Sequence, residues 1–354
     1  MENINRKPTK RISLGKVEIG DNAPVSIQSM LSLPTAHVTA CIKQLHELEA
    51  AGCEIVRMSV TDLKDAKALA ILKRETKMPI VADIHFDYKL ALAALEHGVD
   101  GLRLNPGNIG SREGVEQVVK ASLERQIPIR IGVNSGSLPA DLLSQYGLSP
   151  QSMVEAALRH VRILEELHFD QIKISVKASQ LPLMVESYRL LSSLTDYPLH
   201  LGITESGSML RGTIKSSIAL GTLLQEGIGD TIRVSLTAPP LEEVNVAKEI
   251  LKSLSLRKGL NIISCPTCGR TRINLMELVE KVETALAPYE DIPLTVAVMG
   301  CAVNGPGEAR EADFGIAGGD GEGLVFARGE IIKKVPESQL VEELLAMIIA
   351  EVER

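Results

Sequence analysis

The chain has 354 residues, 45% of them hydrophobic, and this length leaves room for two domains or one large barrel with an appendage. A formal net charge of -7, with 3% aromatic residues and no tryptophan, argues against a nucleic-acid-binding protein. The chain lacks an apolar run of membrane-spanning length, it begins without the apolar core of a signal peptide, and its five cysteines are an odd number, so we expect a cytoplasmic protein without a membrane partner.

Short apolar segments alternate with longer amphipathic segments from residue 25 onward. The apolar segments predict eight strands, at residues 25–30, 54–59, 80–83, 101–105, 129–133, 171–175, 199–204 and 231–235. The amphipathic segments predict helices at residues 39–51, 63–73, 88–96, 112–125, 152–167, 181–194 and 212–226, with an eighth ending near residue 256. Eight strand–helix repeats predict an α/β fold with a TIM (β/α)8 barrel over residues 1–256. The alternative is an open doubly wound sheet, but that fold usually has fewer strands and a G-x-G-x-x-G turn, which is missing here.

Polar and charged side chains recur on the inward phase of these strands. Side chains two residues apart share a strand face, and barrel active sites lie at the C-terminal ends of the strands. In five strands a cation stands between apolar neighbours. Ser59 and Lys177 also fall in this phase. The residues that we assign to substrate binding are Arg57, Asp83, His85, Arg103, Asn105, Arg130, Asn134, Lys173, Ser175, His200, Thr204, Arg233 and Ser235.

Five buried cations in one lumen would repel each other unless negative charge lay among them. Asp83, and Glu205 at the rim, are the only acidic candidates, since Glu242 and Glu243 on the eighth helix are expected to face solvent. A ligand with several negative charges would supply the remainder, and guanidinium groups suit phosphate oxygens. We therefore predict a phosphorylated substrate; the alternative is that the cations are structural.

Glu205 follows the seventh strand and lies off its inward phase. Surrounding cations are expected to lower the pKa of this carboxyl, which favours a carboxylate at rest. It would be able to carry a proton if bound phosphate cancelled those cations.

Residues 257–354 predict a small α+β domain after a linker at residues 257–261. Strands are expected at residues 262–264, 294–299, 314–317, 323–327 and 330–334, and helices at residues 271–286 and 338–353. The eighth barrel helix begins at the catalytic face and ends at the opposite face, so this domain would point away from its own lumen. Cooperation between the two domains therefore favours a head-to-tail homodimer.

Three cysteines in this domain suggest a metal site. Cys265 and Cys268 form a C-x-x-C pair, Cys301 follows a later strand, and all seven histidines precede them. A structural zinc site or an iron–sulfur cubane normally has four protein ligands, so three thiols leave one weaker position. Glu308, after a Gly-Pro-Gly turn, is the candidate for that position. Iron–sulfur, zinc and a redox dithiol all remain compatible with this spacing.

Seven motifs along the chain resemble the 4-hydroxy-3-methylbut-2-enyl diphosphate synthase family of the methylerythritol phosphate pathway, in its compact two-domain bacterial form. They occur in the right order and cover nearly the whole chain. The motifs are Ile27-Gln-Ser-Met, Ala82-Asp-Ile-His-Phe, Leu102-Arg-Leu-Asn-Pro-Gly-Asn, Arg130-Ile-Gly-Val-Asn-Ser-Gly-Ser, His200-Leu-Gly-Ile-Thr-Glu, Ile263-Ser-Cys-Pro-Thr-Cys-Gly-Arg and Val298-Met-Gly-Cys-Ala-Val-Asn-Gly-Pro-Gly-Glu.

The resemblance implies an iron–sulfur oxidoreductase of isoprenoid precursor biosynthesis. Such enzymes reduce 2-C-methyl-D-erythritol 2,4-cyclodiphosphate with two electrons, open its ring and release water. The resemblance further implies a [4Fe-4S] cluster on Cys265, Cys268, Cys301 and Glu308, an essential carboxylate at Glu205, and a position near the substrate for Asn304. Flavodoxin or ferredoxin would donate the electrons, and the family dimer is head-to-tail.

Two alternatives from other classes stay open at this point. One is a phosphate-binding barrel with a structural zinc domain that acts as a docking module without a redox role. The other is a non-redox barrel synthase related to the pterin enzymes, which would keep its activity without residues 257–354. Metal content after purification without air separates the first alternative from the iron–sulfur enzyme.

Overall fold

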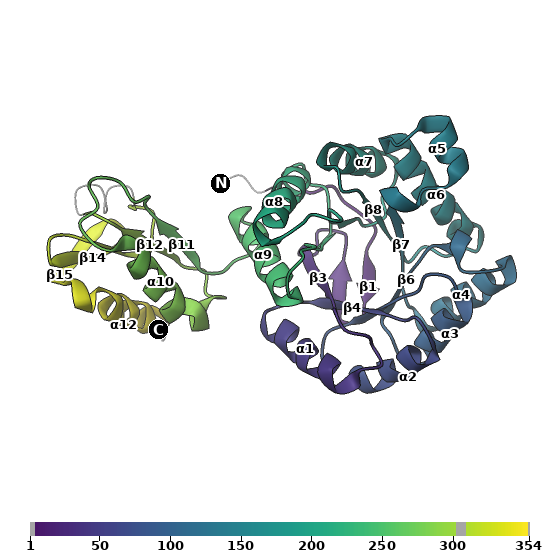
Figure 1. Cartoon of the computed structure of the whole chain (residues 1–354), viewed down its shortest axis with the longest axis horizontal. Coiled ribbons are helices and arrows are strands. Elements are labelled where there is room, and N and C mark those ends of the chain that lie inside the picture. The colour runs from purple at the N-terminus through teal and green to yellow at the C-terminus, as the bar shows by residue number, and fades with distance from the viewer. Residues whose placement is uncertain (1–3, 302–308, 353–354) are drawn as a thin grey trace. The chain divides into compact units, whose positions relative to one another are not determined.

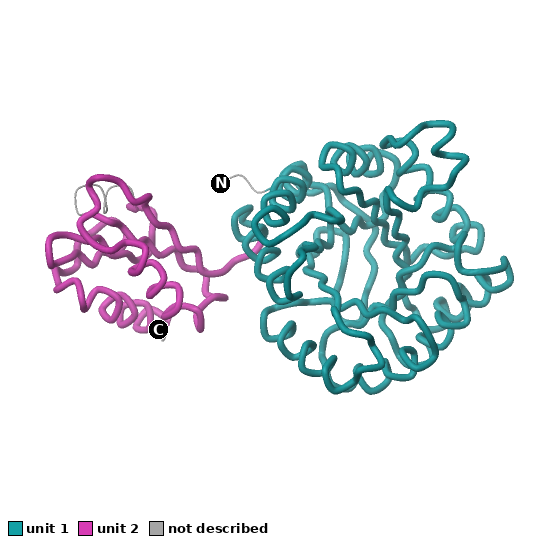
Figure 2. Tube along the Cα trace, in the orientation of Figure 1, with its two compact units in different colours: residues 1–256 teal, residues 257–354 magenta. Residues whose placement is uncertain are grey.

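The computed structural model describes residues 4–301 and 309–352. The chain divides into two compact units, Met1–Leu256 (unit 1) and Arg257–Arg354 (unit 2), which Figure 2 shows in two colours. Within the described residues, no helix has both the length and the apolar character needed to cross a membrane.

Unit 1 is a parallel barrel, as predicted (Figure 1). Strands β8-β7-β6-β5-β4-β3-β10-β9 pair in that order, and a further bridge joins Ile174 of β8 to Leu199, which precedes β9, so the ring is closed. The strands are β3 (Ser26–Met30), β4 (Ile55–Ser59), β5 (Ile80–Asp83), β6 (Gly101–Leu104), β7 (Ile129–Asn134), β8 (Ile172–Lys177), β9 (His200–Leu201) and β10 (Thr231–Ile232).

Helices surround these strands, and the apolar core lies between the two layers. Local sequence signals fix several helix starts. The Asp62 side chain accepts hydrogen bonds from the Lys64 and Asp65 amides at the start of α2, and Ser149 forms a capping box with Ser152 at α6. The helices are α1 (Val38–Ala50), α2 (Leu63–Leu72), α3 (Tyr88–Glu96), α4 (Arg112–Arg125), α5 (Ala140–Tyr146), α6 (Pro150–Glu166), α7 (Leu181–Leu194), α8 (Met209–Gln225) and α9 (Pro240–Ser253).

Strands β9 and β10 are shorter than the sequence pattern predicts. Each has two residues, whereas the apolar pattern continues to Thr204 and Ser235. The backbone leaves the ladder where Gly202 lies close to neighbouring groups: an added Cβ there would lie 2.6 Å from Lys177 Nζ and 2.7 Å from the Arg233 carbonyl oxygen.

An N-terminal hairpin, which the sequence pattern did not reveal, covers the other end of the barrel. β1 (Ile12–Leu14) pairs antiparallel with β2 (Val17–Ile19). Their apolar side chains pack against Ile55 at the start of β4 and Val81 in β5. A ligand therefore reaches the lumen from the C-terminal ends of the strands. The sequence pattern also missed helix α5.

Within its described residues, unit 2 is a five-stranded mixed sheet with two helices, which agrees with the predicted α+β class. The order is β11-β12-β13-β14-β15, in which β11, β12 and β13 are parallel and the last two strands are antiparallel to their neighbours. The elements are β11 (Asn261–Ser264), α10 (Leu275–Leu286), β12 (Thr295–Met299), β13 (Phe314–Ala317), β14 (Glu322–Ala327), β15 (Glu330–Pro336) and α12 (Leu340–Val352).

Candidate active site

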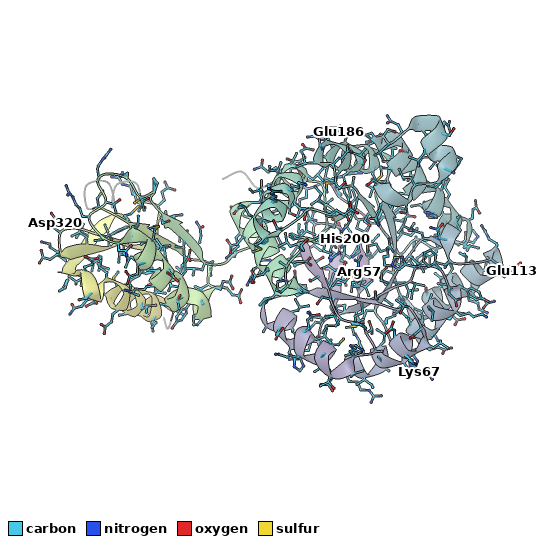
Figure 3. The ribbon with its side chains drawn as sticks, in the orientation of Figure 1. Arg57, Lys67, Glu113, Glu186, His200 and Asp320 are labelled. Atoms are coloured by element: carbon cyan, nitrogen blue, oxygen red, sulfur yellow. The ribbon has the colours of Figure 1, made fainter. Side chains whose placement is uncertain are left out.

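A cavity of about 120 Å³ lies at the C-terminal ends of the barrel strands. Figure 3 shows Arg57 within the ring of strands, with His200 near it in this view. Ten of the thirteen residues that the sequence assigns to substrate binding line the cavity, and Lys177 joins them. The lining residues are Arg57, Asp83, His85, Arg103, Arg130, Asn134, Ser175, Lys177, Thr204, Arg233 and Ser235.

Asp83 is the carboxylate around which the cavity cations are arranged. Its Oδ1 accepts a hydrogen bond from Arg103 Nη1 at 3.1 Å, and its Oδ2 lies 3.6 Å from Arg57 Nε and 3.5 Å from His85 Nε2. Burial by itself would raise the pKa of Asp83, but the hydrogen bond with His85 and the charges of Arg57 and Arg103 outweigh burial and hold that pKa well below its usual value. Asp83 is therefore a permanent anion.

Several N–H groups of the cavity arginines have no hydrogen-bond partner within the described chain. Arg130 donates from Nη1 to Ser175 Oγ at 2.6 Å, while its Nε and Nη2 have no hydrogen-bond partner within the described chain. Nε of Arg103 and Nε of Arg233 are also without a partner there. Buried polar atoms are normally paired, so these N–H groups point to an acceptor that binds from outside the chain. Burial and the nearby Arg233 lower the pKa of Arg57 to about 9, which still leaves it charged at neutral pH.

Glu243 is a second buried anion, and the expectation that it faces solvent is wrong. Its side chain is 5% exposed, its Oε1 accepts from the Leu236 amide at 2.9 Å, and its Oε2 lies 3.6 Å from Arg233 Nη2. Glu243 lies in the first turn of α9, close to the strand ends, and the i, i+4 pattern of that helix does not reveal this placement. Glu243 therefore holds the Arg233 guanidinium by its charge, from the first turn of α9.

Lys177 is a cavity cation that the sequence places in the inward phase but that we did not assign to the site. It is 6% exposed at the end of β8, and burial together with Arg233 and Arg130 lowers its pKa well below the usual lysine value. The sequence indicated Lys177 through its position two residues after Ser175, which places the two side chains on the same face of the strand. The four arginines that line the cavity already outnumber the buried carboxylates Asp83 and Glu243, so the positive excess does not depend on the charge of Lys177.

Three assigned residues do not line the cavity. Lys173 and His200 form part of a deeper layer: Lys173 Nζ lies 3.4 Å from Thr231 Oγ1, and neither ring nitrogen of His200 has a partner in the described part of the chain. Asn105 instead joins β6 to β7, because its side-chain amide exchanges two hydrogen bonds of 3.0 Å with the Gly132 backbone. It positions strand ends rather than facing the cavity.

Glu205 adjoins the cavity residue Thr204 and is exposed. Its backbone has a φ of 54°, a left-handed conformation that is uncommon for residues other than glycine. The next residue, Ser206, is buried and donates its hydroxyl to the Ser235 carbonyl oxygen, which ties this loop to the segment after β10. Strain of this kind often marks functional loops. Glu205 thus lies beside the cavity residue Thr204 on a loop whose backbone is anchored through Ser206.

The cysteine loops lie at one edge of the unit 2 sheet. Cys265 directly follows β11, and Cys301 comes two residues after β12, the parallel neighbour of β11. The Gly300 amide donates to Cys265 Sγ at 3.1 Å, and the Arg272 amide donates to the Gly300 carbonyl at 3.1 Å, which links the two loops. The Arg270 backbone N–H lowers the pKa of the exposed Cys268 thiol.

The lowered pKa of Cys268 favours the thiolate form that ligates metals, and Cys265 accepts an amide hydrogen bond, so this C-x-x-C pair suits a metal cluster chemically. Across residues 4–301 and 309–352, no three His, Cys, Asp or Glu side chains form a ready-made metal site. Asn304 and Glu308 lie outside the described residues. Cys41 and Cys53 are buried in the barrel, where burial raises the pKa of Cys53 to about 12, so neither resembles a ligand.

Comparisons with known proteins cover nearly the whole chain. Residues 9–248 match the GcpE TIM-barrel domain and residues 261–350 match the GcpE protein C-terminal domain. The chain is 60% identical to 4-hydroxy-3-methylbut-2-en-1-yl diphosphate synthase (flavodoxin) of Geobacter sulfurreducens, with 96% of this chain and 97% of the relative covered. It is 57% identical to the enzyme of the same name from Clostridium perfringens, and the match covers 98% of this chain and 99% of that relative.

Solved structures support the fold alone. Dihydropteroate synthase of Yersinia pestis superposes with a TM-score of 0.51 at 12% identity, covering 69% of this chain and 97% of that one. Type I 3-dehydroquinate dehydratase of Clostridium difficile gives a TM-score of 0.50 at 17% identity, covering 69% and 99%.

Proposed function

The chain belongs to the GcpE family, and from this premise we infer that it is a 4-hydroxy-3-methylbut-2-en-1-yl diphosphate synthase, an iron–sulfur oxidoreductase of the methylerythritol phosphate pathway. The reaction is the reductive opening of 2-C-methyl-D-erythritol 2,4-cyclodiphosphate. Two electrons and two protons enter, the ring C–O bond to phosphate breaks, and one hydroxyl leaves as water. The observation that carries the proposal is the buried excess of guanidinium donors in the barrel, on the same chain as three thiols suited to metal binding.

The barrel cavity binds the cyclic diphosphate. Arg103, Arg130 and Arg233 offer the unpaired N–H groups, and bidentate guanidinium contacts match phosphate oxygens. Arg57 and Lys177 add charge to the same wall. The buried anions Asp83 and Glu243 hold the guanidinium groups in place, so the cavity is organised before substrate binds. His85, Asn134, Ser175, Thr204 and Ser235 complete the lining.

Glu205 moves a proton at the rim. Its loop is fixed by the Ser206–Ser235 hydrogen bond beside Thr204, so the carboxylate reaches a substrate group that faces the cavity opening. In this proposal Glu205 delivers a proton to the leaving hydroxyl, which departs as water.

The proposed cofactor is a [4Fe-4S] cluster held by Cys265, Cys268, Cys301 and Glu308. It supplies single electrons, and flavodoxin, named in the relatives' descriptions, or a ferredoxin is the donor. The Gly300 and Arg270 amides stabilise thiolate charge in this chain. Asn304 lies on the same segment as Glu308 and is proposed to contact substrate. Cluster thiols fit the reducing cytoplasm that the cysteine pattern predicts.

The functional enzyme is a head-to-tail homodimer. Leu256, where unit 1 ends, lines a cavity together with Val25, the residue before β3, so the chain leaves the barrel at the N-terminal end of its strands. The substrate cavity lies at the other end. A second subunit in the opposite orientation brings a cluster unit to each cavity.

Metal analysis and turnover measurements test this function. Protein purified without oxygen is expected to contain about four irons per chain, absorb near 400 nm, and reduce the cyclodiphosphate with a viologen as electron donor. Stoichiometric zinc with no iron after anaerobic reconstitution would favour the zinc docking module instead.

A further inference from the structure

A histidine on an outer helix contacts a loop at the catalytic end of the barrel. Helix α6 packs outside β7 and β8 (Figure 1), and His160 lies in its second half. The ring nitrogen Nδ1 of His160 lies 3.2 Å from the Gly107 amide nitrogen. Gly107 is in the short turn η1 (Pro106–Asn108), which begins two residues after β6, the strand of the cavity residue Arg103. The contact therefore joins a helix outside the substrate cavity to the loop after a strand that contributes to it.

The Gly107 amide determines the role of each nitrogen in the His160 ring. A backbone N–H only donates, so Nδ1 accepts, and the proton of the neutral ring is on Nε2. Burial, together with the charge of Arg159, lowers the pKa of His160 from 6.5 to about 4. Arg159 itself pairs with Asp141 and Glu155. The imidazole is therefore neutral at neutral pH and is available as an acceptor for the turn.

The turn approaches the imidazole closely. A Cβ added at Gly107 would lie 2.8 Å from His160 Cε1 and 3.2 Å from its Nδ1, so only glycine allows this approach without displacing the ring. A cavity of about 340 Å³ lies between the turn and α6, and Asn105, Asn108 and His160 are among its lining residues. Packing alone leaves the turn room to move beside this cavity. The hydrogen bond to His160 therefore contributes to the position of the turn.

Further hydrogen bonds connect the turn to the substrate cavity. The Asn108 amide donates to the Asn105 carbonyl oxygen at 2.8 Å, which makes Asn105 the first residue of the turn. The Asn105 side chain exchanges two hydrogen bonds with the Gly132 backbone. The Gly132 carbonyl oxygen also accepts from Nη2 of Arg103 at 3.0 Å. One continuous network therefore runs from His160 to Arg103, which lines the cavity.

The loop has a second anchor, which does not involve His160. The Tyr88 amide, at the start of α3, donates to the Ile109 carbonyl oxygen at 2.9 Å, and the Ile109 side chain is fully buried. This anchor holds the loop on the barrel when the imidazole is replaced. Loss of the acceptor at residue 160 is therefore expected to shift the turn without unfolding the barrel.

We propose that His160 is a positioning residue for substrate binding, which holds the turn after β6 so that Arg103 is oriented toward a substrate phosphate. This inference rests on the proposed function, because it requires that the barrel cavity binds the cyclodiphosphate. His160 is not among the residues that line the cavity, so it acts only through the network. Without its acceptor, Asn105 and Gly132 are held less firmly, and substrate binding must order Arg103 at a cost in affinity.

His160→Leu removes the acceptor and keeps a side chain of moderate size. We expect the dissociation constant of the cyclodiphosphate, measured by calorimetry on protein purified without oxygen, to rise about three- to tenfold, as for the loss of one neutral hydrogen bond. KM should rise by the same factor. The kcat with a viologen donor, the iron content and the circular dichroism should stay as in the wild type. His160→Asn should restore most of the affinity, because its Oδ1 is able to accept from Gly107 in place of Nδ1.

His46→Leu is the matched control. His46 is on α1, and its Nε2 donates to the Glu75 carbonyl oxygen at 2.9 Å, so it also joins an outer helix to a loop backbone. Glu75 lies between α2 and β5, at the N-terminal end of the strands and away from the substrate cavity. We expect His46→Leu to bind the cyclodiphosphate as the wild type does. Equal weakening in His46→Leu and His160→Leu would indicate a general loss of rigidity and overturn the positioning role.

The outcomes separate this role from the proposed function. A wild type that does not bind the cyclodiphosphate would overturn the proposed function, and the positioning role with it. A wild type that binds and reduces it, with equal affinity in His160→Leu, would overturn only the positioning role. The same loss in His160→Asn as in His160→Leu would also overturn that role, because the acceptor atom would not matter. If His160→Leu does not fold, Gly107→Ala displaces the ring from the other side, and unchanged affinity in that variant would overturn the role.

Discussion

The barrel cavity and the cysteine loops are organised in different ways. The cavity side chains extend mainly from strand ends and are held by buried partners, as when Asp83 fixes Arg103 and Glu243 fixes Arg233. The thiols lie on loops, Cys268 is exposed, and no ready-made ligand set occurs among residues 4–301 and 309–352. The cavity side chains are thus held by partners within the barrel, whereas the cysteine loops are linked through the Gly300 backbone, which donates to Cys265 Sγ and accepts from the Arg272 amide.

Removing a cluster thiol is expected to have the largest effect, because it should abolish turnover while leaving substrate binding in the barrel cavity intact. Cys301→Ser should lower turnover at least about 100-fold, because the cluster loses a ligand. Binding of the cyclodiphosphate, measured by calorimetry, should remain, because the cavity does not need the cluster to keep its shape. The control is Cys41→Ser, a buried barrel thiol with no proposed role. Loss of binding in Cys301→Ser would show that the cavity is not preorganised.

Arg103→Met makes the converse change, with a smaller effect. Charge-assisted hydrogen bonds contribute about 1.5–3 kcal/mol each, so the KM for the cyclodiphosphate should rise about 10- to 100-fold. The iron content and absorption near 400 nm should be unchanged. Arg125→Met, on the exposed end of α4, is the matched control. A lost cluster spectrum in Arg103→Met would mean that the barrel cations serve the fold rather than the substrate.

Mixing these two variants tests whether the sites belong to different chains. A dimer of Cys301→Ser with Arg103→Met has one site in which an intact cavity meets an intact cluster. After random exchange, about a quarter of wild-type turnover should return, at substrate well below the KM of Arg103→Met. If both parts of the active site come from one chain, mixing restores nothing. The measurement is viologen-driven turnover after co-refolding or co-expression.

Sequence periodicity was sufficient to predict the barrel and most of the cavity. Inward phase identified Arg57, Arg103 and Arg130 because strand side chains alternate with a fixed period. Strand phase failed where tertiary packing determines the position of a side chain. Glu243 is on a helix whose first turn lies close to the strand ends. Asn105 hydrogen-bonds to the Gly132 backbone of the next strand. The hairpin β1–β2 escaped notice because three-residue strands carry too little pattern.

The thiol loops show another limit of sequence reasoning. Spacing indicated that Cys265 and Cys268 act together, but three ligand chemistries remained open, and the family likeness was needed to choose among them. The amide donated by Gly300 to Cys265 depends on how two parallel strands end together, which no local pattern records. Because loops have no regular periodicity, the chemistry of the cysteine loops could be predicted only from their sequence motifs.

The deeper polar layer of the barrel gives the smallest predicted effect. Burial, with the charge of Arg130, lowers the pKa of Lys173 from 10.5 to about 7. Between these values the unfolded chain binds more protons than the folded chain, so Lys173 makes the free energy of unfolding rise with pH from about 7 to 10.5. Lys173→Met should therefore reduce that slope by about 1 kcal/mol per pH unit, measured by urea unfolding from pH 7 to 10.

The control for this change is Lys67→Met, which alters an exposed lysine on α2 that Figure 3 shows on the outer surface of the barrel. It removes the same charge without touching the lumen, so the slope should stay as in the wild type. Bound cyclodiphosphate stabilises the charged lysine and should also flatten the wild-type slope. If neither Lys173→Met nor the ligand changes the pH dependence of the free energy of unfolding, the positive charge of the cavity does not extend to the layer of Lys173. Substrate binding would then depend on the cations that line the cavity.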